Sequence, residues 1–415
     1  MNQEQLIKYI KRNLKKEIKI NKKKVLGRAW SETGSFVIKI YKCIAKYNYN
    51  NIMMHVKEYA PNNKFRMSSD YKGTFNFSRL IEKKLIIETS KFLKLKFSKV
   101  SGYFTTGGTE ANIYSLWLAR NWAESLLNTQ QVEWVVPVSS HYSIKKAINI
   151  LNIHNDPKHK VHIIGIDNNY IASGENIKRI IKSKRAENND PIIIVLTAVT
   201  TEFGLLDPIE EIIKFIRNNK FVNIFIHIDA CFSGLILPLF KKYENFFSYP
   251  EISTIAIDFH KTFGAPIGSG IVLVNDNYHV FSEIQASYLA ANDCTLIGSR
   301  SGNNVILTWA LFKFQLTNGL WKRRVRASIK LTHFLYEQFK KISYVTVIYP
   351  PFINYLIFKI SGDNIKHLKK IEDVLYEYSI SATLYNNEKF YKIIITDYIK
   401  PKTLVSLINK LKKEQ

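Results

Sequence analysis

The chain has 415 residues, which is enough for two or three domains of about 150 residues each. Apolar residues make up 46% and charged residues 23%, a composition that excludes a disordered chain and a disulfide-stabilised miniprotein. Lysine and arginine number 60 against 34 acidic residues, and the formal net charge of +26 favours contact with polyanions and acidic solutes.

The positive charge is spread along the whole chain, which indicates general surface charge. We expect no nucleic-acid partner, because no basic and aromatic module of known spacing occurs. The cysteines, Cys43, Cys231 and Cys294, form no CxxC pair, which fits a reducing compartment. Residues 1–16 lack the apolar stretch of a signal peptide, and no run approaches the ~18 residues of a membrane helix. We therefore expect a cytoplasmic protein with no membrane partner.

In chain order, residues 1–55 are basic and predict one or two amphipathic helices. Short β-branched runs then alternate with helical stretches between about 100 and 275. These runs are VEWVVPV, KVHIIGI, PIIIVLTAV, NIFIHID, STIAID and GIVLV. Because they are apolar on both faces, they predict a parallel sheet covered by helices on both sides.

After Trp309 a long helical stretch leads to the runs YVTVIYPP, NYLIFKI and FYKIIIT, with a helix near 364–378. This order predicts a small α+β domain. The predicted division is an N-terminal helical segment (1–55), a large domain (56–310) and a small C-terminal domain (311–415).

The segment GYFTTGGTEANIYSLWLAR, which begins at Gly102, places two glycines and a threonine directly before a helix. Backbone N–H groups and the positive end of the helix meet there, an arrangement that binds phosphate. Gly107 and Gly108 let an anion approach the backbone, and the Thr109 hydroxyl can donate to it. The same residues also fit an ordinary loop and helix cap.

Asp229 ends the run NIFIHID, and Lys261 follows the run STIAID. Ligands of parallel sheets lie at the carboxyl ends of the strands, so this carboxylate and this amine should meet beside the glycine turn. A pyridoxal phosphate enzyme needs this arrangement, with Lys261 forming the Schiff base and Asp229 keeping the pyridine nitrogen protonated. His141 offers a ring that can stack on the cofactor. We expect His227 either in the core or beside the residues that contact the cofactor.

Five motifs resemble, in the same order, those of group II pyridoxal phosphate-dependent amino acid decarboxylases: GYFTTGGTEANIYSLWLAR, SSHYSIKKA, HIDA, DFHKTFGAPIGSG and GSRSG. The resemblance covers residues 59–321 and is closest to bacterial histidine decarboxylases, with archaeal tyrosine or aspartate decarboxylases not far behind. It implies a fold type I transferase fold of the α/β class, with a mostly parallel sheet flanked by helices. It also implies pyridoxal 5′-phosphate as cofactor and decarboxylation of an L-amino acid substrate, histidine first, to an amine and carbon dioxide.

The resemblance implies a role for each matching residue. Lys261 would carry the cofactor, Asp229 would hold the pyridinium nitrogen, and His141 would stack on the ring. Gly108, Thr109 and His260 would lie around the phosphate of the cofactor. Cys231 would lie against the face of the ring opposite His141.

The segment YLAANDCTLIGSRSG resembles a mobile loop that reaches the active site of a neighbouring subunit. Tyr288 within it is similar in placement to the tyrosine that returns a proton to the substrate carbon in relatives. The resemblance therefore implies a homodimer with the active site at the interface.

The chain departs from the family pattern at three places. Asp258 stands where histidine decarboxylases carry serine, and a second anion beside a phosphate would be repulsive unless it points away. Diaminobutyrate decarboxylases and sphingosine phosphate lyases do carry aspartate there. Val199 replaces the glycine of a Gly-Thr-Thr motif, and Ser233 replaces the first glycine of a Gly-Gly pair. These departures bear on substrate choice more than on cofactor binding.

Two alternative functions stay open. One is another pyridoxal phosphate reaction that breaks a carbon–carbon bond, such as the retro-aldol cleavage of sphingosine phosphate lyases. The other is a non-catalytic nucleic-acid-binding protein on this scaffold. No metal is expected, because the spacing of His154, His159 and His162 matches no common zinc pattern.

Overall fold

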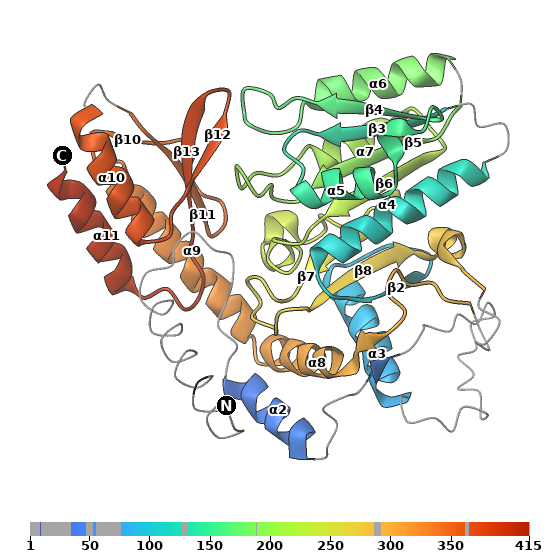
Figure 1. Cartoon of the computed structure of the whole chain (residues 1–415), viewed down its shortest axis with the longest axis horizontal. Coiled ribbons are helices and arrows are strands. Elements are labelled where there is room, and N and C mark those ends of the chain that lie inside the picture. The colour runs from blue at the N-terminus through green and yellow to red at the C-terminus, as the bar shows by residue number, and fades with distance from the viewer. Residues whose placement is uncertain are drawn as a thin grey trace. The chain divides into compact units, whose positions relative to one another are not determined.

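The computed structural model describes residues 9, 35–46, 53–54, 76–126, 131–187, 189–285, 292–361 and 365–414. Two compact units lie within residues 33–320 and 321–415 (Figure 1). The predicted domain limits stay a prediction. Helix α2 (Ser35–Lys46) confirms one helix near the N-terminus, whereas of the helical pattern further upstream only Tyr9 lies within the described residues.

A seven-stranded sheet forms the centre of the larger unit, in the order β2-β8-β7-β6-β5-β3-β4. Neighbouring strands from β7 to β4 are parallel, whereas β8 runs antiparallel to β7 and β2. The strands are β2 (Val100–Thr105), β3 (Val132–Pro137), β4 (His159–Ile164), β5 (Ile192–Thr197), β6 (Ile224–Asp229), β7 (Ile252–Asp258) and β8 (Gly270–Asn275). All six runs predicted as strands are strands, and the mostly parallel sheet is confirmed.

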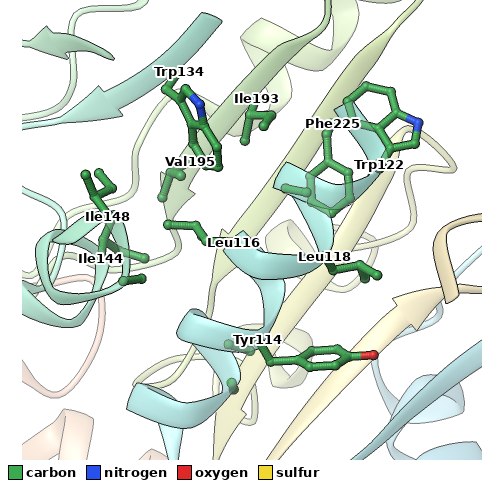
Figure 2. Close-up of a cluster of buried hydrophobic side chains, with 14 of the residues drawn as sticks. Tyr114, Leu116, Leu118, Trp122, Trp134, Ile144, Ile148, Ile193, Val195 and Phe225 are labelled. Atoms are coloured by element: carbon green, nitrogen blue, oxygen red, sulfur yellow. The ribbon is translucent and has the colours of Figure 1, made fainter. Parts of the chain in front are cut away.

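Helices cover this sheet because its strands are apolar on both faces. All six residues of β5 are buried, and alternate residues Ile193 and Val195 belong to a core cluster with α4 and α5. Figure 2 shows this cluster, in which Leu116 of α4 and Ile144 of α5 lie beside the side chains of the strands. Burial of such side chains stabilises by about 1.5–3 kcal/mol each, so this cluster fixes α4 on the sheet.

The remaining elements of the larger unit are helices and short segments. The helices are α3 (Asn76–Phe92), α4 (Gly108–Ser125), α5 (Tyr142–Ile150), α6 (Gly174–Glu187), α7 (Ile209–Asn218) and α8 (Gly302–Thr317). The 3-10 turns are η1 (Ile153–Asn155), η2 (Leu237–Leu239), η3 (Lys241–Tyr243) and η4 (Asp276–Ser282). A two-stranded ladder joins β1 (Met53–Met54) to β9 (Arg300–Ser301).

The smaller unit contains a four-stranded antiparallel sheet in the order β10-β11-β13-β12, together with three helices. This arrangement confirms the predicted α+β character of the C-terminal part. The elements are α9 (Leu320–Phe339), β10 (Val345–Val347), β11 (Tyr355–Ile360), α10 (Ile365–Glu377), β12 (Ala382–Tyr385), β13 (Glu388–Ile394) and α11 (Pro401–Lys413).

None of the helices within the described residues combines the length and the apolar character needed to cross a lipid bilayer.

Candidate active site

The glycine turn joins β2 to the N-terminus of α4, and the sequence predicted the turn and the helix that follows it. Gly107 has a φ of 145°, which favours glycine, and no side chain caps the helix there. A Cβ atom on Gly108 would lie 2.3 Å from Cys231 Sγ and 2.9 Å from Asp258 Oδ2. The turn therefore brings bare backbone and an uncapped, positively polarised helix end into contact with the ends of β6 and β7.

Side chains on both sides of β2 hold this turn in place. Glu110 accepts hydrogen bonds from Thr106 N and Oγ1, both at 2.7 Å, and from Tyr103 Oη at 2.9 Å. A buried ion pair joins Arg300 Nη1 to Glu82 Oε1 at 2.5 Å, and the Arg300 guanidinium lies 5.0 Å from the centre of the Tyr103 ring. Neither Glu110 nor the ion pair of Arg300 with Glu82 was predicted from the sequence, and the two residues of that pair lie far apart along the chain.

Asp229 ends the central strand β6, where it is paired in register with Thr197 of β5 and Ala256 of β7. Its carboxylate is 4% exposed and accepts hydrogen bonds from Asn112 Nδ2 at 2.8 Å and from Cys231 N at 3.1 Å. Burial on its own raises the pKa of Asp229, but the charges of Lys261 and His141 and the Cys231 N–H outweigh it, so the pKa lies below its ordinary value. This buried carboxylate is therefore ionised at neutral pH.

Lys261 lies three residues beyond β7, with its Nζ 3.0 Å from Asp258 Oδ2. Burial lowers the pKa of Lys261, but the negative charges of Asp258 and Asp229 and the hydrogen bond to Asp258 outweigh burial and raise it above its ordinary value. The side chain as a whole remains 22% exposed. Asp258 does not point away from the site but faces its lysine.

His141 precedes α5 and caps it, because its Nδ1 accepts from Ser143 N at 3.3 Å. Ser143 Oγ lies 2.8 Å from the same nitrogen and accepts from Asn112 Nδ2 at 2.8 Å. Asn112 thus links His141 and Asp229, a connection that the sequence reading missed. The one sequence feature that could have indicated Asn112 is helical spacing, because Asn112 lies four residues after Gly108 and therefore on the same face of α4.

The structure also places the other predicted residues at this turn. A Cβ atom on Gly107 would lie 3.0 Å from His260 Cε1, and His260 Nδ1 donates to Ser269 O at 3.1 Å. Cys231 is buried, and burial together with the charges of Asp229 and Asp258 raises the pKa of its thiol, which is therefore uncharged.

Two further residues, Thr109 and Tyr288, were also predicted to belong to the site. Thr109 is half-buried in the first turn of α4, beside Gly108. Tyr288 lies outside the described residues.

Together these groups offer an anion site at a helix end, an amine, an ionised buried carboxylate and a half-buried imidazole. The amine and the carboxylate lie at the ends of neighbouring strands, as predicted from NIFIHID and STIAID. Such a set can bind a phosphorylated aromatic aldehyde at its phosphate, its carbonyl carbon and a ring nitrogen.

Comparison with known proteins gives one family match and many relatives. The conserved domain of pyridoxal-dependent decarboxylases matches residues 82–361. The chain is 29% identical over 336 residues to the probable L-tyrosine/L-aspartate decarboxylase of Methanosphaera stadtmanae, covering 79% of this chain and 80% of that protein. It is 28% identical over 421 residues to the L-aspartate/L-glutamate decarboxylase of Pyrococcus horikoshii, covering 99% and 97%.

A solved structure is similar over the whole chain. The sphingosine-1-phosphate lyase of Burkholderia pseudomallei K96243 superposes with a TM-score of 0.79 at 15% identity, covering 100% of this chain and 90% of that one. At this identity the likeness concerns the fold alone, and it confirms the fold class predicted from the sequence.

Proposed function

We propose that this chain, which belongs to the family of pyridoxal-dependent decarboxylases, removes the α-carboxylate of an aromatic or polar L-amino acid, with histidine as the first candidate. The predictions of an amino acid decarboxylase and of pyridoxal 5′-phosphate as its cofactor are confirmed. Histidine itself rests on the resemblance of the motifs, and the names of the relatives place tyrosine, aspartate and glutamate beside it as candidates.

The residues present fit the cofactor. The uncapped N-terminus of α4 suits its phosphate, because the glycines leave no side chain between the backbone and a bound anion. Lys261 suits its aldehyde, Asp229 its ring nitrogen and His141 its ring face. Asp258 is a negative charge at the phosphate end, but its contact with Lys261 Nζ at 3.0 Å compensates that charge.

When bound, pyridoxal phosphate supplies an aldehyde that condenses with amines and a ring that accepts an electron pair. Asp229 carries the proposal, because a buried carboxylate that is ionised and fixed by Asn112 and Cys231 N would keep the ring nitrogen of the bound cofactor protonated. Each pKa unit by which Asp229 raises the basicity of that nitrogen is worth about 1.4 kcal/mol. His141 and the uncharged Cys231 thiol would enclose the ring and exclude water from it.

The role of Tyr288 and the homodimer rest on the family resemblance, and the cellular location rests on the cysteines. Tyr288 would return a proton to the substrate carbon, and loop closure would exclude water around it. The segment around Tyr288 would reach the site of a partner, which makes a homodimer the working unit. A cytoplasmic location fits the reduced state implied by free cysteines such as Cys231.

The test is product analysis with the full chain loaded with pyridoxal phosphate. The protein is incubated with each of the twenty amino acids, and amines and carbon dioxide are measured. We expect an amine and an equal amount of carbon dioxide from histidine, none of either from Lys261→Ala, and a large loss of rate in Asp229→Ala. An amine from tyrosine or aspartate alone would overturn histidine, and full activity of Asp229→Ala would overturn the role of that carboxylate.

The same assay separates the alternatives. An aldehyde released from a phosphorylated amino alcohol, with no carbon dioxide from any amino acid, would support carbon–carbon cleavage and overturn decarboxylation. A protein that takes up no cofactor and binds DNA or RNA in a salt-sensitive manner would support the non-catalytic alternative.

A further inference from the structure

We propose that Asn112 is a positioning residue that aims the Asp229 carboxylate and the His141 ring together, and that His227 holds Asn112 in place by a hydrogen bond from its Nε2. The proposal rests on the role of Asp229 given above.

The Asn112 amide has only one possible orientation. Its Nδ2 lies 2.8 Å from Asp229 Oδ2 and 2.8 Å from Ser143 Oγ, and the ionised carboxylate can only accept. Both N–H groups are thereby used as donors. The opposite atom, Asn112 Oδ1, is an acceptor and lies 3.0 Å from His227 Nε2. His227 must therefore carry its proton on Nε2.

His227 holds that tautomer at neutral pH, because its ring is uncharged there. It is fully buried, and burial lowers its pKa to about 4, although Asp229 and Thr254 act in the opposite direction. A neutral ring with a proton on Nε2 has a bare Nδ1. That nitrogen accepts from Thr254 Oγ1 at 2.9 Å, so the neighbouring strand β7 fixes the ring.

The second branch of this network ends at the site. Ser143 Oγ accepts from Asn112, so its own proton is directed to His141 Nδ1 at 2.8 Å. His141 Nδ1 is then an acceptor, and in the neutral ring the proton lies on Nε2. The orientation of one buried amide therefore sets both the direction of the Asp229 carboxylate and the tautomer of the neutral His141 ring.

Two substitutions at one position separate positioning from simple packing. In His227→Gln the side-chain amide nitrogen reaches the place of Nε2 and can still donate to Asn112. In His227→Asn the shorter amide reaches only the place of Nδ1 and keeps Thr254 alone. Asn112→Leu removes the amide with a side chain of similar volume, and Asp229→Asn is the control for the carboxylate itself.

The readouts are the dissociation constant of pyridoxal phosphate, the ¹⁵N shift of its ring nitrogen when bound to the full chain, and the thermal unfolding midpoint. Asn112→Leu should weaken cofactor binding about tenfold or more and shift the ring nitrogen towards its unprotonated value, because the hydrogen bond to the ionised Asp229 is lost. His227→Asn should act in the same direction, because Asn112 loses the donor that holds its amide in place. His227→Gln should stay within about threefold of the parent, even if its unfolding midpoint falls as far as that of His227→Asn.

The cofactor-free protein gives an independent check. The ¹⁵N spectrum of His227 should show a neutral ring with its proton on Nε2 between pH 5 and pH 8. A proton on Nδ1, or equal cofactor binding by His227→Gln and His227→Asn, would overturn the proposal. If Asp229→Asn itself leaves the cofactor's ring nitrogen and its binding unchanged, the role of Asp229 fails instead.

Discussion

The C-terminal unit and the polar end of the central sheet are built in opposite ways. In the C-terminal unit apolar side chains fill the core, and charged pairs such as Lys359 with Glu388 lie at the surface. At the ends of β6 and β7, by contrast, His227, Asp229 and Asp258 are each at most 5% exposed. The C-terminal unit gains stability from apolar burial, whereas these strand ends hold two costly buried carboxylates, Asp229 and Asp258, that hydrogen-bond and charge partners compensate, beside a neutral His227.

We expect the largest loss of stability from a substitution in the apolar core of the C-terminal unit, on strand β11. Phe358 of β11 is fully buried, with ring centres 5.0 Å from Phe339 and 5.5 Å from Tyr391. We expect Phe358→Ala to lower the free energy of unfolding by about 3–5 kcal/mol, because it leaves a cavity in the core. Denaturant unfolding of the full chain measures the change.

The adjacent residue is the matched control. Lys359 is half-buried, and its Nζ lies 2.6 Å from Oε2 of the exposed Glu388 and 4.6 Å from the centre of the Phe390 ring. We expect Lys359→Ala to lower the free energy of unfolding by about 1–2 kcal/mol, because an exposed ion pair and a cation–π contact each contribute about 1 kcal/mol or less. Equal losses for the two variants would contradict the view that apolar burial, and not surface charge, holds this unit together.

At the polar end of the central sheet, we expect Asp258→Asn to change the rate at which the protein binds pyridoxal phosphate covalently. Because Asp258 raises the pKa of Lys261, its removal should lower that pKa and increase the fraction of neutral amine, about tenfold for each unit. Neutral amine is the form that attacks an aldehyde. We therefore expect faster covalent uptake of pyridoxal phosphate at pH 7–8 by the cofactor-free protein, followed by its visible absorbance.

The raised pKa of Lys261 also makes the stability of the protein depend on pH. The stability that Lys261 contributes by its raised pKa is fully present below its unfolded pKa near 10.4 and is lost as pH rises through the folded value. Asp258→Asn should show less of this loss above pH 10. An unchanged rate of uptake at neutral pH would show that Asp258 does not control the amine.

The sequence predicted the elements whose signal is local. The six apolar runs became strands because β-branched residues covered on both faces favour no other structure. Strand β2 was missed because its residues led into the glycine turn and were read as part of it. Strand β12 (Ala382–Tyr385) was missed because its residues alternate between exposed and half-buried and show no continuous apolar run.

The site divides in the same way. Asp229 and Lys261 could be found because each follows a strand, and the topology of parallel sheets brings strand ends together. Asn112 could not be singled out, because its partners Ser143 and His227 are distant in sequence and meet it only in the folded chain. The direction of the Asp258 side chain is likewise a property of the turn after β7.

The smallest predicted effect concerns Val199, which stands where the family has glycine. Its φ is +73°, in the left-handed region that costs a β-branched residue about 1–2 kcal/mol. The residue before it, Ala198, donates from its backbone N to Asp229 O at 2.9 Å, so this strain lies beside the site. The matched control is Val195, a valine within β5 that is also buried. We expect Val199→Gly to lower the free energy of unfolding by about 1–2 kcal/mol less than Val195→Gly does, because only the change at Val199 relieves backbone strain. Equal losses in denaturant unfolding would show that the backbone at Val199 stores no strain.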